Sequence, residues 1–336
     1  MTQIAILGSG AWGTALALAL SPRHQVTLWS HRPEHAQELA ESQENRRYLP
    51  GFPLPASLEI TADDQAIANS EILLSTIPSQ FLRSTIARLG PHISARQTLV
   101  SATKGIEDQT HLRMTQVIRE SLLHQPLPVS LPIGALSGPS FAQEVAQGQP
   151  TALTIAFAHP ALAARIQTEF SSPTLRLYTT DDVTGVEMGG ALKNVIAIAA
   201  GVASGLGLGH NSTAALITRG IAEITRLAVA SGARPETLRG LSGMGDLILT
   251  CTGSLSRNRT VGQKLGAGQK LPEILASLDG KVAEGISTTR AALGLASKLN
   301  IEMPITEQME LILNEGKDPK SAIKELMQRP GRDEMD

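Results

Sequence analysis

The pattern of hydrophobic and polar positions changes near residue 180. Before that point, short β-branched runs alternate with helical stretches, which is typical of a mostly parallel sheet covered by helices. From Val183 onward, Ala-rich helical patterns dominate, including a long apolar one from Val186 to about Ser231 that breaks near the glycines at 201 to 209. The predicted strands are Gln3–Leu7, Gln25–Trp29, Ile72–Thr76, Thr98–Ser101, Ile133–Ser137 and Thr151–Phe157.

Length and composition agree with two folded domains. A chain of 336 residues exceeds the usual size of one domain, and 42% hydrophobic against 18% charged residues is the balance of a globular protein. We therefore predict an α/β domain over residues 1–182 and an all-helical domain over residues 183–336. The formal net charge of -2 provides no overall field that would attract nucleic acid or anionic lipid, so an anionic ligand needs a local site.

Several features favour a cytoplasmic protein without a membrane span. Cys251 is the sole cysteine, which excludes an intrachain disulfide and a cysteine-based zinc site. A strand-like run begins at Ile4, so we expect no export signal. The longest apolar run, Val195 to Leu208, falls short of the roughly 20 residues that span a bilayer, and it predicts a buried helix.

A glycine motif, Gly8-Ser9-Gly10-Ala11-Trp12-Gly13, lies between the first predicted strand and a helix. Gly8 would allow a tight turn, Gly10 would let the backbone approach a pyrophosphate, and Gly13 would let the helix pack closely on the strand. With a second strand at the distance that a βαβ unit requires, this context predicts a Rossmann-like dinucleotide site. The alternative is a glycine-rich turn that binds no ligand.

The residues after the second strand, Ser30-His31-Arg32, bear on cofactor choice. No carboxylate is available there for the ribose hydroxyls of NAD(H), whereas Arg32 could meet the 2′-phosphate of NADP(H), so NADP(H) or dual use is favoured. Arg32 could equally be a solvated surface charge. His31 and His35 have a metal-like spacing, but Pro33 between them opposes a helix there, and we predict no metal site.

Two further segments carry candidate chemistry. Lys193 is the only charged residue between Glu187 and His210, and burial in so apolar a helix would lower its pKa toward that of a general acid or base, unless it snorkels to the surface. Ser256-Arg257-Asn258 precedes a predicted helix, Thr260 to Leu265, where a capped N-terminus and a guanidinium would suit a phosphate. A plain capped helix with solvated arginines is the alternative.

Further motifs besides the glycine loop extend along the chain: Ser101-Ala102-Thr103-Lys104-Gly105-Ile106, Leu136-Ser137-Gly138-Pro139-Ser140-Phe141-Ala142, Ala191-Leu192-Lys193-Asn194-Val195, Gly243-Met244-Gly245-Asp246-Leu247, Thr250-Cys251, Ser256-Arg257-Asn258 and Val282-Ala283-Glu284-Gly285. With these motifs the chain resembles the bacterial NAD(P)-dependent glycerol-3-phosphate dehydrogenases over nearly its whole length. The resemblance implies a catalytic cleft between the domains, interconversion of sn-glycerol 3-phosphate and dihydroxyacetone phosphate, and supply of glycerol 3-phosphate for phospholipid synthesis.

The resemblance also implies roles for individual residues. Without it, Lys104 would be a surface lysine after a strand, and Asp246 would bond its own backbone or cap a helix. As a member of the family, the chain would use Lys193, Lys104 and Asp246 in catalysis. Cofactor contacts would come from Gly8, Gly10, Trp12, Gly13, His31, Arg32, Lys104, Ala142, Arg257, Val282 and Glu284. Substrate contacts would come from Lys104, Gly138, Ser140, Lys193, Asn194, Asp246, Ser256, Arg257 and Asn258.

Two alternatives stay open at this point. One is a dehydrogenase of another hydroxy acid on the same plan, such as a 6-phosphogluconate or ketopantoate type enzyme. The other is a non-catalytic NADP(H) sensor, which the set Lys193, Lys104 and Asp246 opposes because a sensor needs no acid or base. The choice between NAD(H) and NADP(H) and the oligomeric state, with a homodimer as one option, are not determined by the sequence.

Overall fold

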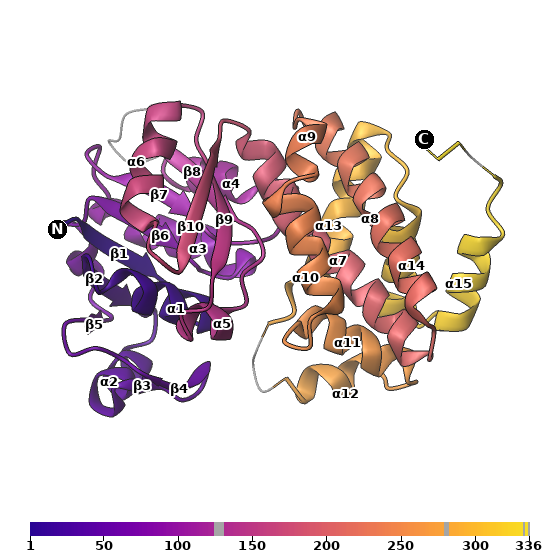
Figure 1. Cartoon of the computed structure of the whole chain (residues 1–336), viewed down its shortest axis with the longest axis horizontal. Helices are drawn as coiled ribbons and strands as arrows, with labels where there is room; N and C mark the ends of the chain where they lie inside the picture. The colour runs from indigo at the N-terminus through magenta and orange to yellow at the C-terminus, as the bar shows by residue number, and fades with distance from the viewer. Residues whose placement is uncertain (124–130, 279–281, 332, 335–336) are drawn as a thin grey trace.

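The computed structural model describes residues 1–123, 131–278, 282–331 and 333–334. Its N-terminal half is built on an eight-stranded sheet with helices on both faces, and its C-terminal half is a bundle of helices beside it (Figure 1). The predicted combination of a Rossmann-like α/β part and an all-helical part is confirmed. The last strand of the sheet ends at Thr180, and the central helix of the bundle, α7, begins at Val183.

The sheet has the strand order β10-β9-β8-β7-β6-β1-β2-β5, and every neighbouring pair is parallel except β8 with β9. The order reverses at β1, between β2 and β6, so the crevice at the carboxyl ends of these strands is where open α/β sheets bind ligands. The elements of this half are β1 (Gln3–Leu7), α1 (Ala11–Leu20), β2 (Gln25–Trp29), α2 (Pro33–Ser42), β3 (Glu44–Asn45), β4 (Leu49–Pro53), β5 (Glu59–Thr61), η1 (Asp64–Ile67), β6 (Ile72–Ser75), α3 (Ser79–Leu89), η2 (Gly90–His92), β7 (Thr98–Ser101), α4 (Met114–Ser121), β8 (Ile133–Ser137), α5 (Ala142–Ala146), β9 (Thr151–Ala156), α6 (Pro160–Phe170) and β10 (Leu175–Thr180).

All six predicted strands are present, with β6 and β9 each ending one residue earlier than expected. The sequence analysis missed β5 and β10, which form the two edges of the large sheet, and the short pair β3 and β4. Only alternate residues of β10 are buried, because an edge strand is covered on one side, and β5 has only three residues. Neither strand carries the continuous apolar run that marks a central strand.

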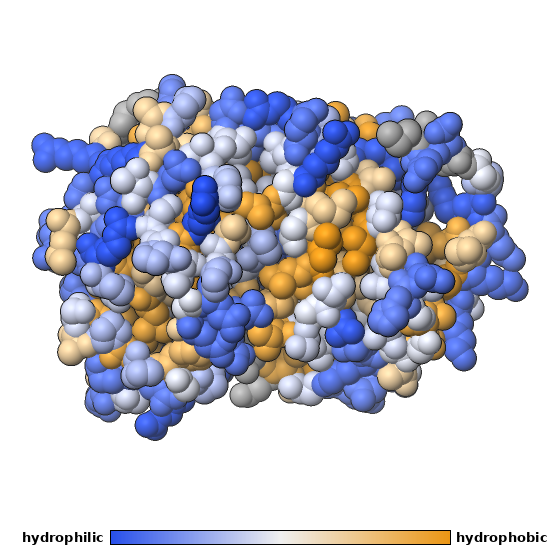
Figure 2. Space-filling model, viewed as in Figure 1, coloured by the Kyte–Doolittle hydropathy of each residue, from blue (hydrophilic) through white to orange (hydrophobic). Residues whose placement is uncertain are grey.

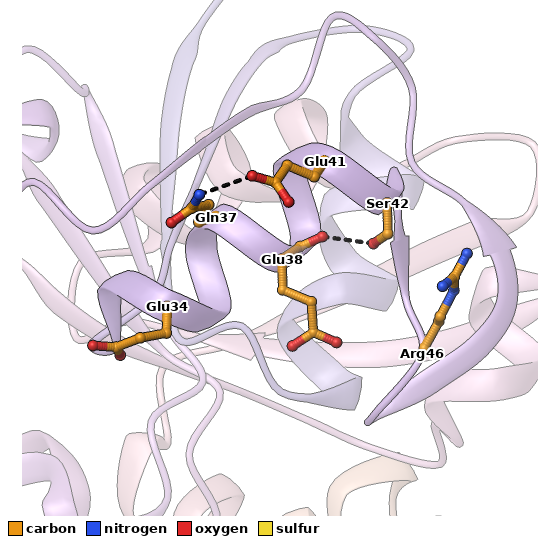
Figure 3. Close-up of a pocket in the computed structure, with 6 residues that line it drawn as sticks. All are labelled: Glu34, Gln37, Glu38, Glu41, Ser42 and Arg46. Carbon is orange, nitrogen blue, oxygen red and sulfur yellow. Dashed lines mark hydrogen bonds between the residues drawn. The ribbon is translucent and has the colours of Figure 1, made fainter.

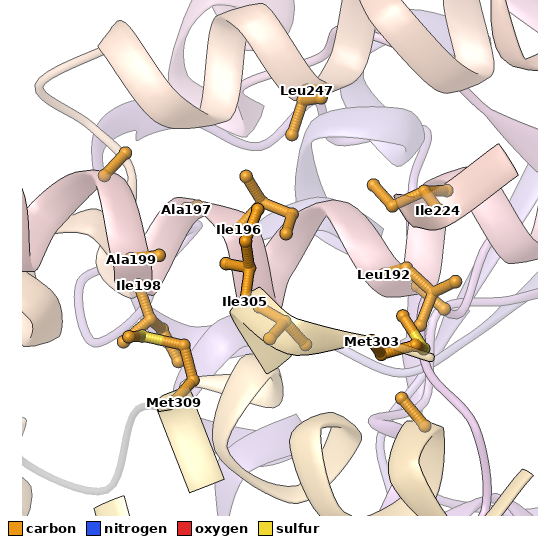
Figure 4. Close-up of a cluster of buried hydrophobic side chains, with 14 of the residues drawn as sticks. Leu192, Ile196, Ala197, Ile198, Ala199, Ile224, Leu247, Met303, Ile305 and Met309 are labelled. Atoms are coloured by element: carbon orange, nitrogen blue, oxygen red, sulfur yellow. The ribbon is translucent and has the colours of Figure 1, made fainter. Parts of the chain in front are cut away.

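The helical half surrounds α7 (Val183–Gly205), which is buried along nearly its whole length. Leu192, Ile196 and Ile198 of α7 meet side chains from several other helices, including Ile224 and Met309, in one apolar cluster (Figure 4). The remaining elements are α8 (His210–Ala230), α9 (Pro235–Leu238), η3 (Leu241–Gly245), α10 (Asp246–Thr252), α11 (Arg257–Gly266), α12 (Leu271–Ala276), α13 (Glu284–Leu299), α14 (Pro304–Asn314) and α15 (Pro319–Met327).

Helix α7 is longer than the apolar run from Val195 to Leu208 suggested. It has 23 residues, and by length and a mean hydropathy of 1.3 it is apolar enough to cross a membrane, so the expectation that this segment is too short was wrong. Glu187 and Lys193 interrupt the apolar run without ending the helix. The whole apolar window is buried inside the protein, as the prediction of a buried helix required.

Glycines set the distance between α7 and α11. A β-carbon added to Gly262 of α11 would lie 2.0 Å from the carbonyl oxygen of Ile198, and one added to Gly201 of α7 would lie 2.1 Å from the carbonyl oxygen of Arg259. The two backbones therefore touch, which only glycine permits. This contact fixes the start of α11, with Ser256, against the part of α7 that carries Lys193.

Helices α8 and α10 also present apolar side chains to solvent. Figure 2 shows apolar surface over the helical half, in the region where Figure 1 draws these two helices. Val229 of α8 is 44% exposed and Ile248 of α10 is 45% exposed. Exposed apolar side chains are common on monomers, so these two residues do not indicate a binding partner.

Candidate active site

The glycine loop between β1 and α1 has the geometry that a dinucleotide requires. Gly8 has a φ of +118°, which strongly favours glycine, and a β-carbon on Gly13 would lie 1.9 Å from the carbonyl oxygen of Gly8. A β-carbon on Gly10, in contrast, would meet nothing within 4 Å. Helix α1 has no side-chain cap at its N-terminus, so its first N–H groups are available to an anion at Gly10. The loop therefore fits a pyrophosphate.

The segment after β2 lies beside this loop. Ser30 is buried and accepts a hydrogen bond of 2.9 Å from the hydroxyl of Ser9, which ties the segment to the glycine loop. Arg32 precedes α2 and donates to the hydroxyl of Tyr48 at 3.2 Å. Burial, followed by the charge of Arg32, lowers the pKa of His31. An open surface cavity of about 440 Å³ borders His31 and is also lined by Pro33, Ala62, Asp63, Asp64, Gln65, Arg88 and His92.

Two lysines and one aspartate form a buried cluster where the two halves meet. Asp246, which is 0% exposed at the start of α10, accepts a hydrogen bond from Lys193 of α7 through Oδ1. Its other oxygen, Oδ2, accepts a hydrogen bond of 2.6 Å from Lys104, which follows β7. The carboxylate thus bridges the ammonium groups of Lys104 from the sheet and Lys193 from the bundle. Both lysine side chains therefore converge on one carboxylate where the two halves of the protein meet.

The charge of Lys193 is poised near neutral pH. Only 6% of this residue is exposed, and burial lowers the pKa of its ammonium to about 8. The carboxylate of Asp246 opposes this shift, and the positive charge of Lys104 adds to it. An amine with such a pKa is a competent proton donor below pH 8 and a proton acceptor above it, so Lys193 can serve a reaction in both directions.

Thr250 is a member of this cluster that the sequence analysis did not assign. Its hydroxyl accepts a hydrogen bond of 2.8 Å from Lys193 and donates one of 2.6 Å to the carbonyl oxygen of Asp246. Thr250 lies four residues after Asp246 on α10, so one helical turn places both side chains on the same face. That spacing is the signal by which Thr250 could have been found.

The N-terminus of α11 is next to Lys193. Ser256 is its N-cap and accepts a hydrogen bond of 3.2 Å from the N–H of Arg259, so of the two caps that the sequence allowed, the structure uses Ser256. Asn258 donates to Asn194, the neighbour of Lys193 on α7, at 2.9 Å and accepts from the N–H of Gly285 at 3.0 Å. The amide nitrogen Nδ2 of Asn194 is buried without a partner among the described residues.

Arg257 and Glu284 complete the charges around this place. Arg257 is exposed at the first position of α11, and within the described parts of the chain no hydrogen bond or ion pair holds its guanidinium. Glu284, at the first position of α13, has a pKa raised by burial, while the charges of Arg257, Lys104 and Lys193 act in the opposite direction. These four groups therefore share one electrostatic environment.

The segment after β8 lies against Lys104. The carbonyl oxygen of Gly138 accepts hydrogen bonds from Lys104 at 3.3 Å and from the hydroxyl of Ser140 at 3.0 Å. Ala142 begins α5 and packs with Trp12 of α1 around the small apolar cluster of Ala15, Leu49 and Val145. Ala142 thus follows the lysine site in sequence and adjoins the glycine-loop helix in space.

The predicted site residues therefore fall into connected groups rather than one contact network. The bonded cluster contains Lys104, Lys193, Asp246, Gly138 and Ser140. His31 and Arg32 lie after β2, where Arg32 bonds Tyr48. A second surface hollow, lined by residues of α2 with Ser42 and Arg46, contains none of the predicted site residues (Figure 3). Val282 directly precedes Ala283, the N-cap of α13.

The fold and this site define a class of protein. A loop shaped for a pyrophosphate at the carboxyl ends of parallel strands, together with a buried lysine of lowered pKa in the helical half, is typical of a dinucleotide-dependent dehydrogenase. In the described residues no group of three or more potential metal ligands occurs.

Comparison with known proteins identifies the family. The chain belongs to the NAD-dependent glycerol-3-phosphate dehydrogenase family, because the family's N-terminal model matches residues 3–163 and its C-terminal model matches residues 182–324. A glycerol-3-phosphate dehydrogenase (NAD(P)+) of Acidobacterium capsulatum is 57% identical, with 99% of this chain and 100% of that protein aligned. One from Koribacter versatilis is 53% identical, with 100% and 99% aligned. The crystal structure of the Coxiella burnetii glycerol-3-phosphate dehydrogenase is 40% identical and superimposes with a TM-score of 0.92, covering 98% of this chain and 99% of that one.

Proposed function

We propose that this enzyme interconverts sn-glycerol 3-phosphate and dihydroxyacetone phosphate by hydride transfer to or from NAD(P). The observation that carries the proposal is the buried Lys193–Asp246–Lys104 cluster, which faces the start of α11 with its exposed Arg257. Two relatives above half identity over their full length carry this activity in their names. The family match of both halves favours this substrate over another hydroxy acid. The acid–base cluster argues against a non-catalytic NADP(H) sensor, which needs no acid or base.

In the proposed mechanism, Lys193 moves the proton. Bound NAD(P)H supplies the hydride, and its oxidised form accepts one. During reduction, the ammonium of Lys193 donates a proton to the oxygen that develops negative charge at C2, and during oxidation the neutral amine removes the hydroxyl proton. Asp246 would orient both lysines and bond a substrate hydroxyl, while Lys104 would bond the oxygen at C2. Thr250 would help to orient Lys193 through the hydrogen bond that its hydroxyl accepts.

The remaining site residues have binding roles in this proposal. Ser256, Arg257 and Asn258 would hold the substrate phosphate at the N-terminus of α11, with Asn194 donating its free amide N–H. Gly138 and Ser140 would contact the substrate beside Lys104. The cofactor would be held by Gly8, Gly10, Trp12, Gly13, His31, Arg32, Lys104, Ala142, Arg257, Val282 and Glu284.

Replacing Arg257 with alanine is expected to raise the KM for dihydroxyacetone phosphate by about 10- to 100-fold, since a charge-assisted contact to phosphate contributes about 1.5–3 kcal/mol. Activity with dihydroxyacetone, which has no phosphate, should change less than threefold. Steady-state kinetics with both substrates measures this. Arg96→Ala provides the matched control, because this exposed arginine precedes β7, at the end of that strand opposite to Lys104. An unchanged KM for dihydroxyacetone phosphate would remove Arg257 from the phosphate site.

The first experiment follows the absorbance of NADPH, and separately of NADH, in the presence of dihydroxyacetone phosphate. Saturable oxidation supports the proposed reaction, and the ratio of kcat/KM values gives the cofactor preference, which we propose favours NADPH through Arg32. No oxidation by protein that binds either cofactor would reject this substrate, and 6-phosphogluconate and ketopantoate would then be assayed.

The wider context is part of the same proposal. We propose residues 1–182 and 183–336 as the two domains, supported by the start of α7 at Val183 and by a C-terminal family match that begins at residue 182. The single cysteine, Cys251, is buried and unpaired, which suits a cytoplasmic enzyme. Supplying glycerol 3-phosphate to phospholipid synthesis is the role that membership of this family supports.

A further inference from the structure

The segment from the end of β8 to the start of α5 contacts the helical half with every second side chain. Ser137, Pro139 and Phe141 each lie against a different glycine of that half. A β-carbon on Gly190 would lie 2.5 Å from Oγ of Ser137, and one on Gly253 would lie 2.5 Å from Cε2 of Phe141. Pro139 is in ordinary van der Waals range of Gly245, with Cγ 3.6 Å from the site of a β-carbon. Glycine at positions 190 and 253 therefore makes room for the segment.

The intervening residues of this segment serve the proposed active site. The carbonyl oxygen of Gly138 accepts hydrogen bonds from Lys104 and Ser140, as described above. Gly138 has a φ of +142°, so the chain bends directly after β8. The carbonyl oxygen at this bend bonds Lys104, while the side chains of Ser137, Pro139 and Phe141 lie against glycines of the helical half.

Phe141 is the largest of the three side chains, and its ring lies where α10 ends. Gly253 donates its N–H to the carbonyl oxygen of Leu249 at 2.8 Å and accepts, through its own carbonyl oxygen, a hydrogen bond of 3.3 Å from the N–H of Ser256. This short turn therefore joins the residue under the Phe141 ring directly to the N-cap of α11. Among the described residues, the buried apolar clusters of the two halves do not include Phe141, so its ring is not explained by a core.

We propose that Phe141 is a positioning residue for the substrate phosphate: its ring, seated on Gly253, holds the turn 253–256 and through it Ser256 and Arg257. The inference rests on the proposed function, because it deepens the role of the same site. Phe141 itself touches neither reacting atoms nor phosphate. Its effect passes through the hydrogen bond between Ser256 and Gly253, so a loss of the ring should weaken phosphate binding and leave proton transfer by Lys193 in place.

The test compares Phe141→Ala with Phe141→Leu, which restores part of the lost volume. Phe141→Ala should raise the KM for dihydroxyacetone phosphate at least tenfold, with kcat and the KM for NADPH changed less than threefold, and Phe141→Leu should recover most of this loss. The kcat/KM for dihydroxyacetone should change less than twofold. Tyr178→Ala, a truncated aromatic on the edge strand β10 that is 47% exposed, should behave as wild type. Equal losses with both substrates, or no change in KM, would overturn the proposal.

A binding measurement separates this inference from the proposed function. Titration of the NADPH-bound protein with inorganic phosphate by calorimetry should give a Kd at least fivefold higher for Phe141→Ala than for wild type. If the wild-type protein binds phosphate but does not reduce dihydroxyacetone phosphate, only the proposed function fails, and the phosphate titration still decides the role of Phe141. If wild type and Phe141→Ala bind phosphate equally, or neither binds it, the inference about Phe141 is wrong.

Discussion

Replacing Lys193 with alanine is expected to lower kcat for dihydroxyacetone phosphate by about 1000-fold, while the Kd for NADPH changes less than twofold. A positioned general acid contributes roughly 100- to 10,000-fold to a rate, and Lys193 is the group whose pKa of about 8 suits that role. Steady-state kinetics and fluorescence titration of NADPH measure the two quantities. Asp246 keeps Lys104 as its ion-pair partner in this variant, so its buried carboxylate is not left without a positive charge beside it.

The truncated side chain also allows a test by chemical rescue. Small primary amines added to Lys193→Ala should restore part of kcat, because they can occupy the space of the missing side chain and donate the proton. Lys320→Met, which removes an exposed lysine at the start of α15, controls for the loss of a positive charge. A variant at position 193 that kept more than a tenth of wild-type turnover would show that another group transfers the proton.

Periodicity predicted most of the fold because central strands and buried helices leave strong signals. The six central strands carry continuous apolar runs, since both of their faces are covered. Helix α7 was expected from its Ala-rich pattern, although its N-terminal turns, with Gly189, Gly190 and Glu187, weaken the apolar signal. The edge strands β5 and β10 could not be found this way, because strand pairing at an edge depends on neighbours far away in the chain.

The candidate site was predicted in its residue types but not in its contacts. The isolation of Lys193 in an apolar helix left a buried amine and a lysine that snorkels to the surface as alternatives, and the structure shows that Lys193 is buried. Its pairing with Asp246 depends on how α7 packs against α10 within the helical half. The pairing of Asp246 with Lys104, across 142 positions of sequence, depends on how the two halves pack. Without that packing, Asp246 looks like a turn residue and Lys104 like a solvated lysine.

The side-chain partners at the periphery of the site could not be predicted from the sequence either. A cap at the start of α11 was expected from Ser256 or Asn258, and the fold separates their roles by turning Asn258 toward Asn194. Tyr48 reaches Arg32 from the loop before β4, and no spacing rule joins these two positions. Phe141 belongs to a recognised motif, yet only the closeness of Gly253 reveals what its ring meets.

Replacing Asp246 with asparagine should shift the pH dependence of kcat/KM and should therefore affect reduction and oxidation differently at a given pH. In the wild type, kcat/KM for reduction should fall as pH rises through about 8, where Lys193 loses its proton, and kcat/KM for oxidation should rise over the same range. Asp246 raises the pKa of Lys193, so its removal leaves burial and the charge of Lys104 to lower that pKa further. The pH profiles of kcat/KM for reduction and for oxidation should therefore both shift to lower pH by about one unit or more.

The lower pKa of Lys193 in this variant should reduce kcat/KM more for reduction than for oxidation. At pH 8 reduction by Asp246→Asn should fall by about 100-fold or more, because Lys193 is then mostly neutral and a substrate contact is also lost. Oxidation at the same pH should suffer less, since it needs the neutral amine. Profiles of kcat/KM between pH 6 and 10 in both directions measure the effect, with Asp181→Asn, at an exposed ion pair, as the control. If kcat/KM fell equally for reduction and oxidation and neither pH profile shifted, Asp246 would bind substrate without setting the charge of Lys193.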